Sequence, residues 1–174
     1  MSESKIMGNG NTKKQSFAVK MDLQRQLVDA VKLDNVQRIR DLIYYEHVDP
    51  NILTLPSGHR WRPIHYAAVY GSYNSLTLLM ERYNVSPNQK DAYGWLPIHL
   101  SVFNGHVQCT RLLLHYKSLQ PKTDRDYPGK HGTKKKTPLE LAHLIRDYRH
   151  MELFNENSIP CAIYVHPLHG ESGK

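Results

Sequence analysis

Residues 58–72 read GHRWRPIHYAAVYGS, and residues 92–106 read AYGWLPIHLSVFNGH. The Pro-Ile-His triplet occurs in both stretches, 34 residues apart, and the chain's only two tryptophans, Trp61 and Trp95, each stand two positions before it. A period of this length is typical of repeat proteins in which every unit is one supersecondary element.

Two further segments carry weaker copies of the pattern. PLELAHLIRD begins at Pro138, and QLVDAVKLDN begins at Gln26 without the proline. A second apolar segment follows each copy, such as LTLLM from Leu76 and VQCTRLLL from Val107. One position always holds a small residue: Ala30, Ala67, Ser101 and Ala142. The pattern predicts helix–turn–helix units with hairpin loops that must stack, because one unit alone cannot bury its apolar face.

The stretch DAYGWLPIHLSVFNGHVQCTRLLL, residues 91–114, resembles the ankyrin repeat. The consensus of that family runs roughly D-x-x-G-x-T-P-L-H-x-A-A-x-x-G-H and continues through V-x-L-L-L to V-N. The matching positions include Asp91, Gly94, Pro97, His99, Gly105, His106 and Val107. The resemblance covers about residues 22–156 and implies an all-α ankyrin-repeat solenoid of four stacked units with atypical capping repeats. The predicted repeats are residues 22–55, 56–90, 91–123 and 124–156.

We therefore expect an ankyrin repeat domain over residues 21–156 with a tail on each side. Residues 1–20 are polar with a net charge of +3, which predicts a disordered basic tail, and residues 157–174 form the C-terminal tail. The last repeat carries a long basic hairpin finger, Asp124–Lys136. Residues 122–136 hold a net charge of +4, so the two basic segments account for the whole net charge of +7. The neutral remainder makes a nucleic-acid partner less favoured, since such proteins carry a basic stripe on the folded surface.

The sequence contains no recognised catalytic motif. A P-loop, G-x-G-x-x-G, G-x-S-x-G and H-E-x-x-H are all missing, so we expect no enzyme, no catalytic residues and no cofactor. His65 and His99 occupy the histidine of the family's Pro-Leu-His motif. The resemblance implies that these rings are structural braces, bonded to backbone between neighbouring hairpins.

Two weaker groupings raise the question of a metal. His106 and Cys109 lie three residues apart, and Cys161 precedes His166 and His169 near the end of the chain. Neither group supplies the four ligands of a structural zinc site. We expect Cys109 to lie in the core and no metal to bind, although a metal-dependent activity seated on the tail stays open as a third hypothesis.

Cellular location follows from what the chain does not carry. The two cysteines do not make a disulfide framework, and no apolar run approaches the roughly 20 residues that span a bilayer. The N-terminal residues MSESKIMGNGNTKKQS contain no apolar signal region. We expect a protein of the cytoplasm or the nucleus that is a monomer by itself.

The ankyrin resemblance also implies where a partner binds. Family members contact partners through the hairpin residues before the proline and through the ends of the inner helices. Carried onto this chain, these positions are Arg60, Trp61, Tyr70, Tyr93, Trp95, Phe103, Lys134 and Lys136. Clustered Trp, Tyr and Arg dominate interface energetics, and the neighbouring lysines suit an acidic–apolar segment of another protein. The expected function is a non-enzymatic adaptor or inhibitor.

A structural role for the tryptophans is the alternative. Thr137 provides the family's helix-capping threonine in the last repeat, but the two middle repeats lack it. There, Trp61 packed on Tyr66 and Trp95 packed on Leu100 would form hydrophobic staples that fix how the chain enters each helix. Burial of both tryptophans would indicate staples, whereas exposed outer ring faces would indicate a contact surface.

The alternative function is association with nucleic acid or an anionic membrane. The N-terminal tail and KHGTKKK, residues 130–136, would supply the positive charge. Such binding would weaken steeply with salt and would survive replacement of both tryptophans.

Overall fold

The computed structural model describes residues 10–54, 58–116 and 136–158. Eight α-helices and no strands occur in this part of the chain. The helices are α1 (Gly10–Lys32), α2 (Val36–Tyr44), α3 (Pro63–Tyr70), α4 (Tyr73–Glu81), α5 (Pro97–Phe103), α6 (Val107–His115), α7 (Pro138–Leu144) and α8 (Tyr148–Ser158).

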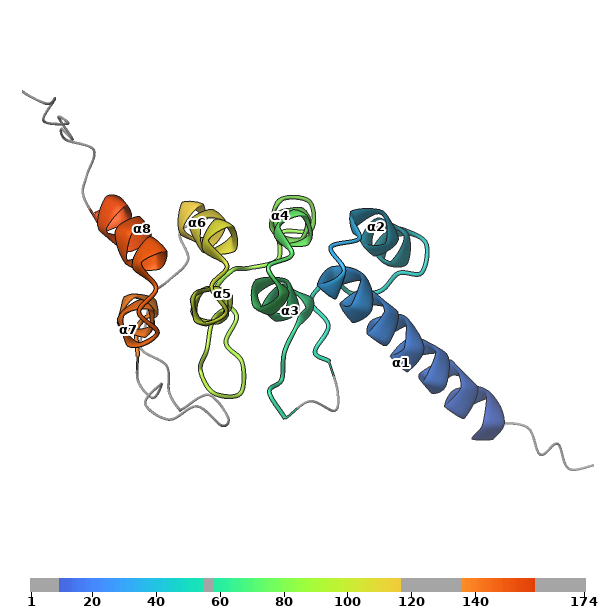
Figure 1. The fold of residues 1–174 in the computed structure, drawn as a ribbon. Coiled ribbons are helices and arrows are strands. Elements are labelled where there is room, and N and C mark those ends of the chain that lie inside the picture. Colours follow the sequence, from blue (N-terminus) through green and yellow to red (C-terminus); the bar gives the residue numbers. More distant parts are fainter. Residues whose placement is uncertain (1–9, 55–57, 117–135, 159–174) are drawn as a thin grey trace, which may run out of the picture.

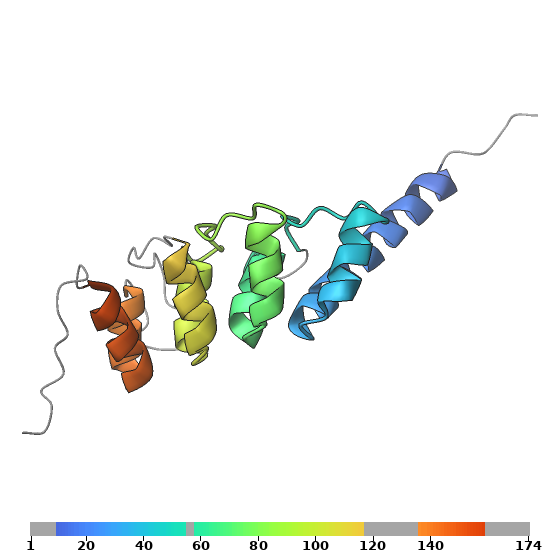
Figure 2. The same cartoon turned by 90° about the horizontal axis from the view of Figure 1, so that it is seen from above.

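Four antiparallel helix pairs stack in two layers. The inner helices α1, α3, α5 and α7 form one row, and the outer helices α2, α4, α6 and α8 form the other (Figure 1). Seen from above, the pairs follow one another in chain order along a single direction (Figure 2). The hairpins before α3 and α5 extend from the inner row (Figure 1). The predicted all-α solenoid of four stacked units is confirmed.

Helix α1 begins earlier than the sequence predicted. Residues 10–20 were expected in a disordered tail, yet they belong to a helix of 23 residues that extends beyond the stack (Figure 1). Leu27 and Val31 are fully buried and anchor its C-terminal part, so the turns before them propagate from a helix that is already nucleated. The extension could not be predicted from hydrophobic periodicity, because these polar residues continue the helix without an apolar face.

The small-residue position of the repeat lies at the contacts between neighbouring units. All four of its members are buried: Ala30, Ala67, Ser101 and Ala142. The hydroxyl of Ser101 donates to the Ile98 carbonyl at 3.0 Å, so this buried polar group is satisfied. Small side chains here allow the inner helices to approach closely.

A left-handed residue joins the two helices of every unit. These residues are Asp34, Gly71, Gly105 and Arg146, with φ of 53°, 71°, 77° and 56°. At Gly71 the space is restricted as well, because a Cβ would lie 2.5 Å from Nδ1 of His106. Glycine adopts this conformation readily in the two middle units, but the first and last units use residues for which it costs about 1 kcal/mol.

Asp34 has a second role that offsets this cost. Its Oδ1 accepts hydrogen bonds from the backbone N–H and the hydroxyl of Ser75, both at 2.7 Å. Its Oδ2 accepts from the side-chain amide of Asn74 at 2.9 Å. The turn of the first unit therefore holds the start of α4 in the second.

Candidate partner-binding surface

The hairpins of the second and third units are joined by hydrogen bonds. Ala92 N–H donates to the His59 carbonyl at 2.8 Å. Asp91, in the third unit's hairpin, accepts from the indole N–H of Trp61 at 3.1 Å and from the backbone N–H of Trp95 at 2.8 Å. Burial raises the pKa of Asp91 above its usual value, although these hydrogen bonds oppose the shift. The two hairpins consequently form one continuous structure.

Both tryptophans are buried, which corrects the predicted contact surface. Trp61 is 8% exposed and Trp95 is 0% exposed. The ring of Trp61 packs edge-on against Tyr66, with centroids 5.2 Å apart, which confirms the predicted staple in the second unit. The ring of Trp95 packs edge-on against Phe103 at 5.6 Å. The proposed contact of Trp95 with Leu100 stays a prediction, and neither tryptophan offers an exposed face to a partner.

His65 is a brace of the kind that the family resemblance implied, and for His99 the described bond lies within its own unit. Nδ1 of His65 accepts from the Arg62 backbone N–H at 3.1 Å, and Nε2 lies 2.9 Å from the Gln89 carbonyl. Because Nδ1 accepts, the proton is on Nε2, which donates to Gln89. His99 Nδ1 accepts from the Leu96 N–H at 3.0 Å. Burial lowers the pKa of His65 to about 4, so the ring is neutral at physiological pH.

These histidines also provide part of the helix capping in the two middle units, which lack the capping threonine. In the fourth unit, Thr137 N–H donates to Glu140 at 2.7 Å, and Glu140 N–H donates back to the threonine hydroxyl at 3.2 Å. His65 and His99 stand at the same third helical position as Glu140 and accept the same backbone N–H. The spacing Pro-x-His thus supplies half of a capping box.

The other predicted contact residues differ in exposure. Arg60 is exposed and left-handed, with φ of 53°, at the position where the third unit has Gly94. Tyr70, at the end of α3, is 53% exposed. Tyr93, Phe103 and Lys136 are half-buried, and the Tyr93 ring lies 5.6 Å from that of His59. Lys134 lies outside the described residues.

Lys32 is a surface residue that the sequence analysis missed. Its Nζ lies 5.5 Å from the ring centroid of Tyr66 and 5.8 Å from that of Tyr70, within cation–π range. It also pairs with Asp29 at 3.1 Å. A recess of about 460 Å³ opens beside Lys32 and Tyr66 on α1 and α3. The first unit diverges from the repeat consensus, so the pattern gave no reason to single out this lysine.

One buried cluster has the appearance of a catalytic triad. Thr110 Oγ1 lies 2.9 Å from His150 Nε2, and His150 Nδ1 lies 2.8 Å from Asp147 Oδ2. A second hydroxyl, that of Ser101, lies 2.8 Å from Thr110 Oγ1. However, Ser101, Thr110 and His150 are all 0% exposed, so no substrate can reach either hydroxyl. The cluster joins the third unit to the fourth.

The His106 and Cys109 grouping has structural partners instead. Nε2 of His106 lies 2.8 Å from the Val69 carbonyl, and Cys109 is buried in the core, where burial raises the pKa of its thiol to about 12. Within residues 10–54, 58–116 and 136–158, no three His, Cys, Asp or Glu side chains gather as metal ligands would. Cys161, His166 and His169 lie outside these ranges.

The described helices were also compared with what a membrane span requires. None of them is both long enough and apolar enough to cross a bilayer.

The chain consists of stacked helix pairs, with hairpins and inner helices along one side. This arrangement is typical of the class of repeat proteins that bind other proteins. A family model described as ankyrin repeats (3 copies) matches residues 27–126, more than half of the chain. The chain therefore belongs to the ankyrin repeat family. Ankyrin repeats are generally protein–protein interaction modules.

Three relatives show how far the similarity extends. An ankyrin repeat-containing protein of Schizosaccharomyces pombe is 34% identical over 34% of this chain and 25% of its own length. The 26S proteasome non-ATPase regulatory subunit 10 of Dictyostelium discoideum is 29% identical over 52% of this chain and 38% of its own length. Ankyrin repeat domain-containing protein 13C of Danio rerio is 36% identical over 32% of this chain and 11% of its own length. The chain thus spans well under half of each relative.

Proposed function

We propose that this protein is an adaptor or inhibitor that binds an acidic–apolar segment of another protein on its inner surface. We define the inner surface as the side formed by the hairpins and the inner helices, with Arg60, Tyr70, Tyr93 and Phe103 as predicted contacts. The observation that carries the proposal is Tyr70, which is 53% exposed at the end of α3 beside the Lys32 ammonium. A large aromatic ring next to a cation suits a partner that carries both apolar and acidic side chains.

The hairpin conformation supports the same surface. Arg60 holds a left-handed backbone, which is unfavourable for a residue with a Cβ, although glycine fills the same place one unit later. It makes no hydrogen bond or ion pair with any described residue. A strained, exposed and unpaired arginine is better explained by a partner than by folding.

The buried tryptophans change the experiment that tests this proposal. Trp61→Ala/Trp95→Ala would damage the core, so loss of binding would report unfolding. The double variant Arg60→Gly/Tyr70→Ala removes two exposed side chains and relaxes the left-handed position. Affinity capture with mass spectrometry from the native cell identifies the bound protein, and its affinity is then measured for each variant.

The chain offers a matched control at the other end of the stack. Arg146 is also exposed and left-handed, with φ of 56°, and Tyr148 is 75% exposed. We expect Arg60→Gly/Tyr70→Ala to weaken partner binding at least tenfold, which is about 1.4 kcal/mol, while Arg146→Gly/Tyr148→Ala binds normally. Equal affinities for the two double variants would reject the inner surface as the binding site.

The role, location and assembly state belong to the same proposal. The Dictyostelium relative is by name a non-ATPase regulatory subunit, which supports an adaptor role within a larger assembly. We propose a cytoplasmic or nuclear protein that is a monomer until it binds its partner. The competing function, association with nucleic acid or an anionic membrane, predicts binding that falls steeply with salt and is insensitive to Arg60→Gly/Tyr70→Ala.

A further inference from the structure

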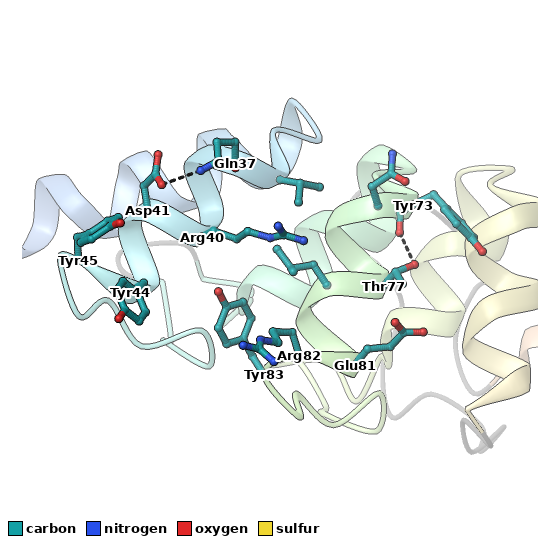
Figure 3. Close-up of a pocket in the computed structure, with 13 residues that line it drawn as sticks. Gln37, Arg40, Asp41, Tyr44, Tyr45, Tyr73, Thr77, Glu81, Arg82 and Tyr83 are labelled. Atoms are coloured by element: carbon teal, nitrogen blue, oxygen red, sulfur yellow. Dashed lines mark hydrogen bonds between the residues drawn. The ribbon is translucent and has the colours of Figure 1, made fainter.

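A groove of about 1050 Å³ separates the outer helices α2 and α4 (Figure 3). It lies on the outer layer of the stack, whereas the inner surface is formed by the opposite row of helices and the hairpins (Figure 1). Tyr44 and Tyr45 border it from α2, and Tyr73 and Tyr83 border it from the second unit. A second recess at the same end is lined by Tyr44, Tyr45 and Tyr83, so the tyrosine surface continues beyond the groove.

The groove is unusually aromatic for the outside of a helical stack. Tyr44, Tyr45 and Tyr73 are 72%, 71% and 42% exposed, and the rings of Tyr44 and Tyr45 meet edge-to-face at 4.9 Å. Four of the chain's eleven tyrosines line this one groove. The repeat does not require Tyr44 and Tyr45, because the corresponding positions in the second unit hold Glu81 and Arg82. Exposed aromatic rings gathered in this way are characteristic of interaction sites.

Two arginines and two carboxylates line the groove, so its formal net charge is zero, and the guanidinium groups are the charged groups left without a partner. Arg40 and Arg82 are both exposed, and neither side chain makes a hydrogen bond or ion pair with a described residue. The two carboxylates of the groove are already engaged. Asp41 accepts from a glutamine amide at 3.0 Å, and Glu81 accepts from a tyrosine hydroxyl. In Figure 3, Arg40 reaches from α2 toward α4, and Arg82 lies beside Tyr83.

We propose that this groove is a second docking site, for a protein segment in which carboxylates flank an aromatic or aliphatic side chain. The carboxylates would pair with Arg40 and Arg82, since guanidinium groups bind carboxylates through two parallel hydrogen bonds. The apolar side chain would pack on Tyr44 and Tyr83. Because the inner surface lies on the other side of the stack, the chain has room for two partners at once, as an adaptor requires.

The test uses the full chain and a displayed library of random peptides. Selection on the wild-type protein is counter-selected against Arg40→Gln/Arg82→Gln. We expect enriched peptides to carry two or more Asp or Glu around an aromatic or aliphatic residue. A synthetic copy of the best peptide should bind the wild-type protein at least tenfold more tightly than the variant. The variant should keep the wild-type thermal unfolding curve, because these arginines hold no described partner.

A matched variant separates the groove from general electrostatics. Arg25→Gln/Arg146→Gln removes the same charge from two exposed residues outside the groove whose side chains likewise have no described partner, so the peptide should bind it about as well as the wild type. In NMR spectra, the ring signals of Tyr44 and Tyr83 should shift on peptide addition while those of Tyr70 stay in place.

Several results would overturn the proposal. These are failure to enrich any peptide, enrichment of peptides without acidic residues, equal loss of affinity in both arginine pairs, and shifts confined to Tyr70. A single-stranded oligonucleotide that displaces the peptide from the groove would reassign it to nucleic acid. Self-association that disappears in Arg40→Gln/Arg82→Gln, measured by sedimentation, would reassign it to a second copy of the chain. None of these results depends on whether the inner surface binds its own partner.

Discussion

The second and third units are the most similar in sequence, yet they differ in which aromatic side chains they expose. In the second unit, Trp61 is 8% exposed and Tyr70 is 53% exposed, whereas Trp95 of the third unit is completely buried. The two rings also differ in their described contacts, because Trp95 packs on Phe103 of its own unit. Trp61 bonds to Asp91 of the following hairpin, so its environment is set outside its own repeat. The comparison teaches that the second unit displays the most exposed predicted contacts, Arg60 and Tyr70, whereas the third unit buries its tryptophan and adds the half-buried Tyr93 and Phe103.

The largest expected effect on stability comes from replacing each of the two tryptophans separately. We expect Trp95→Ala to lower the free energy of unfolding by about 4 kcal/mol, because it empties a fully buried site, and Trp61→Ala to cost less. Urea denaturation followed by circular dichroism measures both. Tyr148→Ala, at an exposed ring, should change stability by less than about 0.5 kcal/mol. A larger effect at Trp61 than at Trp95 would contradict this difference in burial.

The second test uses the pH dependence of the brace in the second unit. His65 has a pKa lowered to about 4 by burial, whereas histidine in the unfolded chain titrates near 6.5. Only the unfolded chain gains a proton between these values, so stability is complete above pH 6.5 and falls as the pH drops toward 4. The expected loss from this residue is about 3 kcal/mol.

His65→Gln provides the control for that titration. Glutamine can still accept the backbone N–H at the third helical position but has no proton to gain. Denaturation curves collected across the acid range should therefore show a flatter dependence for the variant. A parallel dependence in both proteins would mean that His65 is not the group that titrates.

The third test compares the glycines that link the helices of each unit. Both Gly71→Ala and Gly105→Ala force a side chain into a left-handed position, which costs about 1 kcal/mol. Gly71→Ala also places a Cβ 2.5 Å from the His106 ring, whereas the nearest atoms at Gly105 are 3.9 Å away. We expect thermal denaturation to show a loss of about 2–3 kcal/mol at Gly71 and about 1 kcal/mol at Gly105. Equal losses would show that the His106 ring moves aside freely.

The smallest effect is expected at the hairpins. Arg60→Gly removes the left-handed strain that Gly94 avoids in the third unit, and we expect it to raise the free energy of unfolding by about 0.5 kcal/mol. The reverse change, Gly94→Ala, should lower it by about 1 kcal/mol. Urea denaturation of the two variants checks the signs. Destabilisation by Arg60→Gly would indicate that the arginine side chain supports the hairpin rather than a partner.

The periodic features of this molecule could be predicted from sequence. The four units, the small residues at Ala67 and Ser101, and the histidines at the third helical position recur because each unit must cap its inner helix and pack closely on its neighbour. The repeat therefore encodes how the units stack. It also placed the staple of Trp61 on Tyr66 correctly.

The features that escaped prediction are those that the repeat does not determine. The exposed fraction of Trp95 escaped prediction because the sequence pattern fits a buried staple and an exposed contact residue equally. Lys32 and the left-handed Asp34 and Arg146 belong to the first and last units, whose sequences drift from the consensus. The tyrosines of the outer groove, such as Tyr44, have no counterpart at the same position in the next unit. Such residues are recognised only when the helices are placed side by side.

The position of Asp91 has a consequence for how the stack opens. This carboxylate belongs to the third unit but accepts the indole N–H of the second, and His65 donates in turn to the Gln89 carbonyl just before it. In a one-dimensional chain of units, strong coupling at one boundary makes the two flanking units melt together. Hydrogen exchange should therefore report a central pair that opens only in global unfolding, while the first and fourth units fray independently from either end.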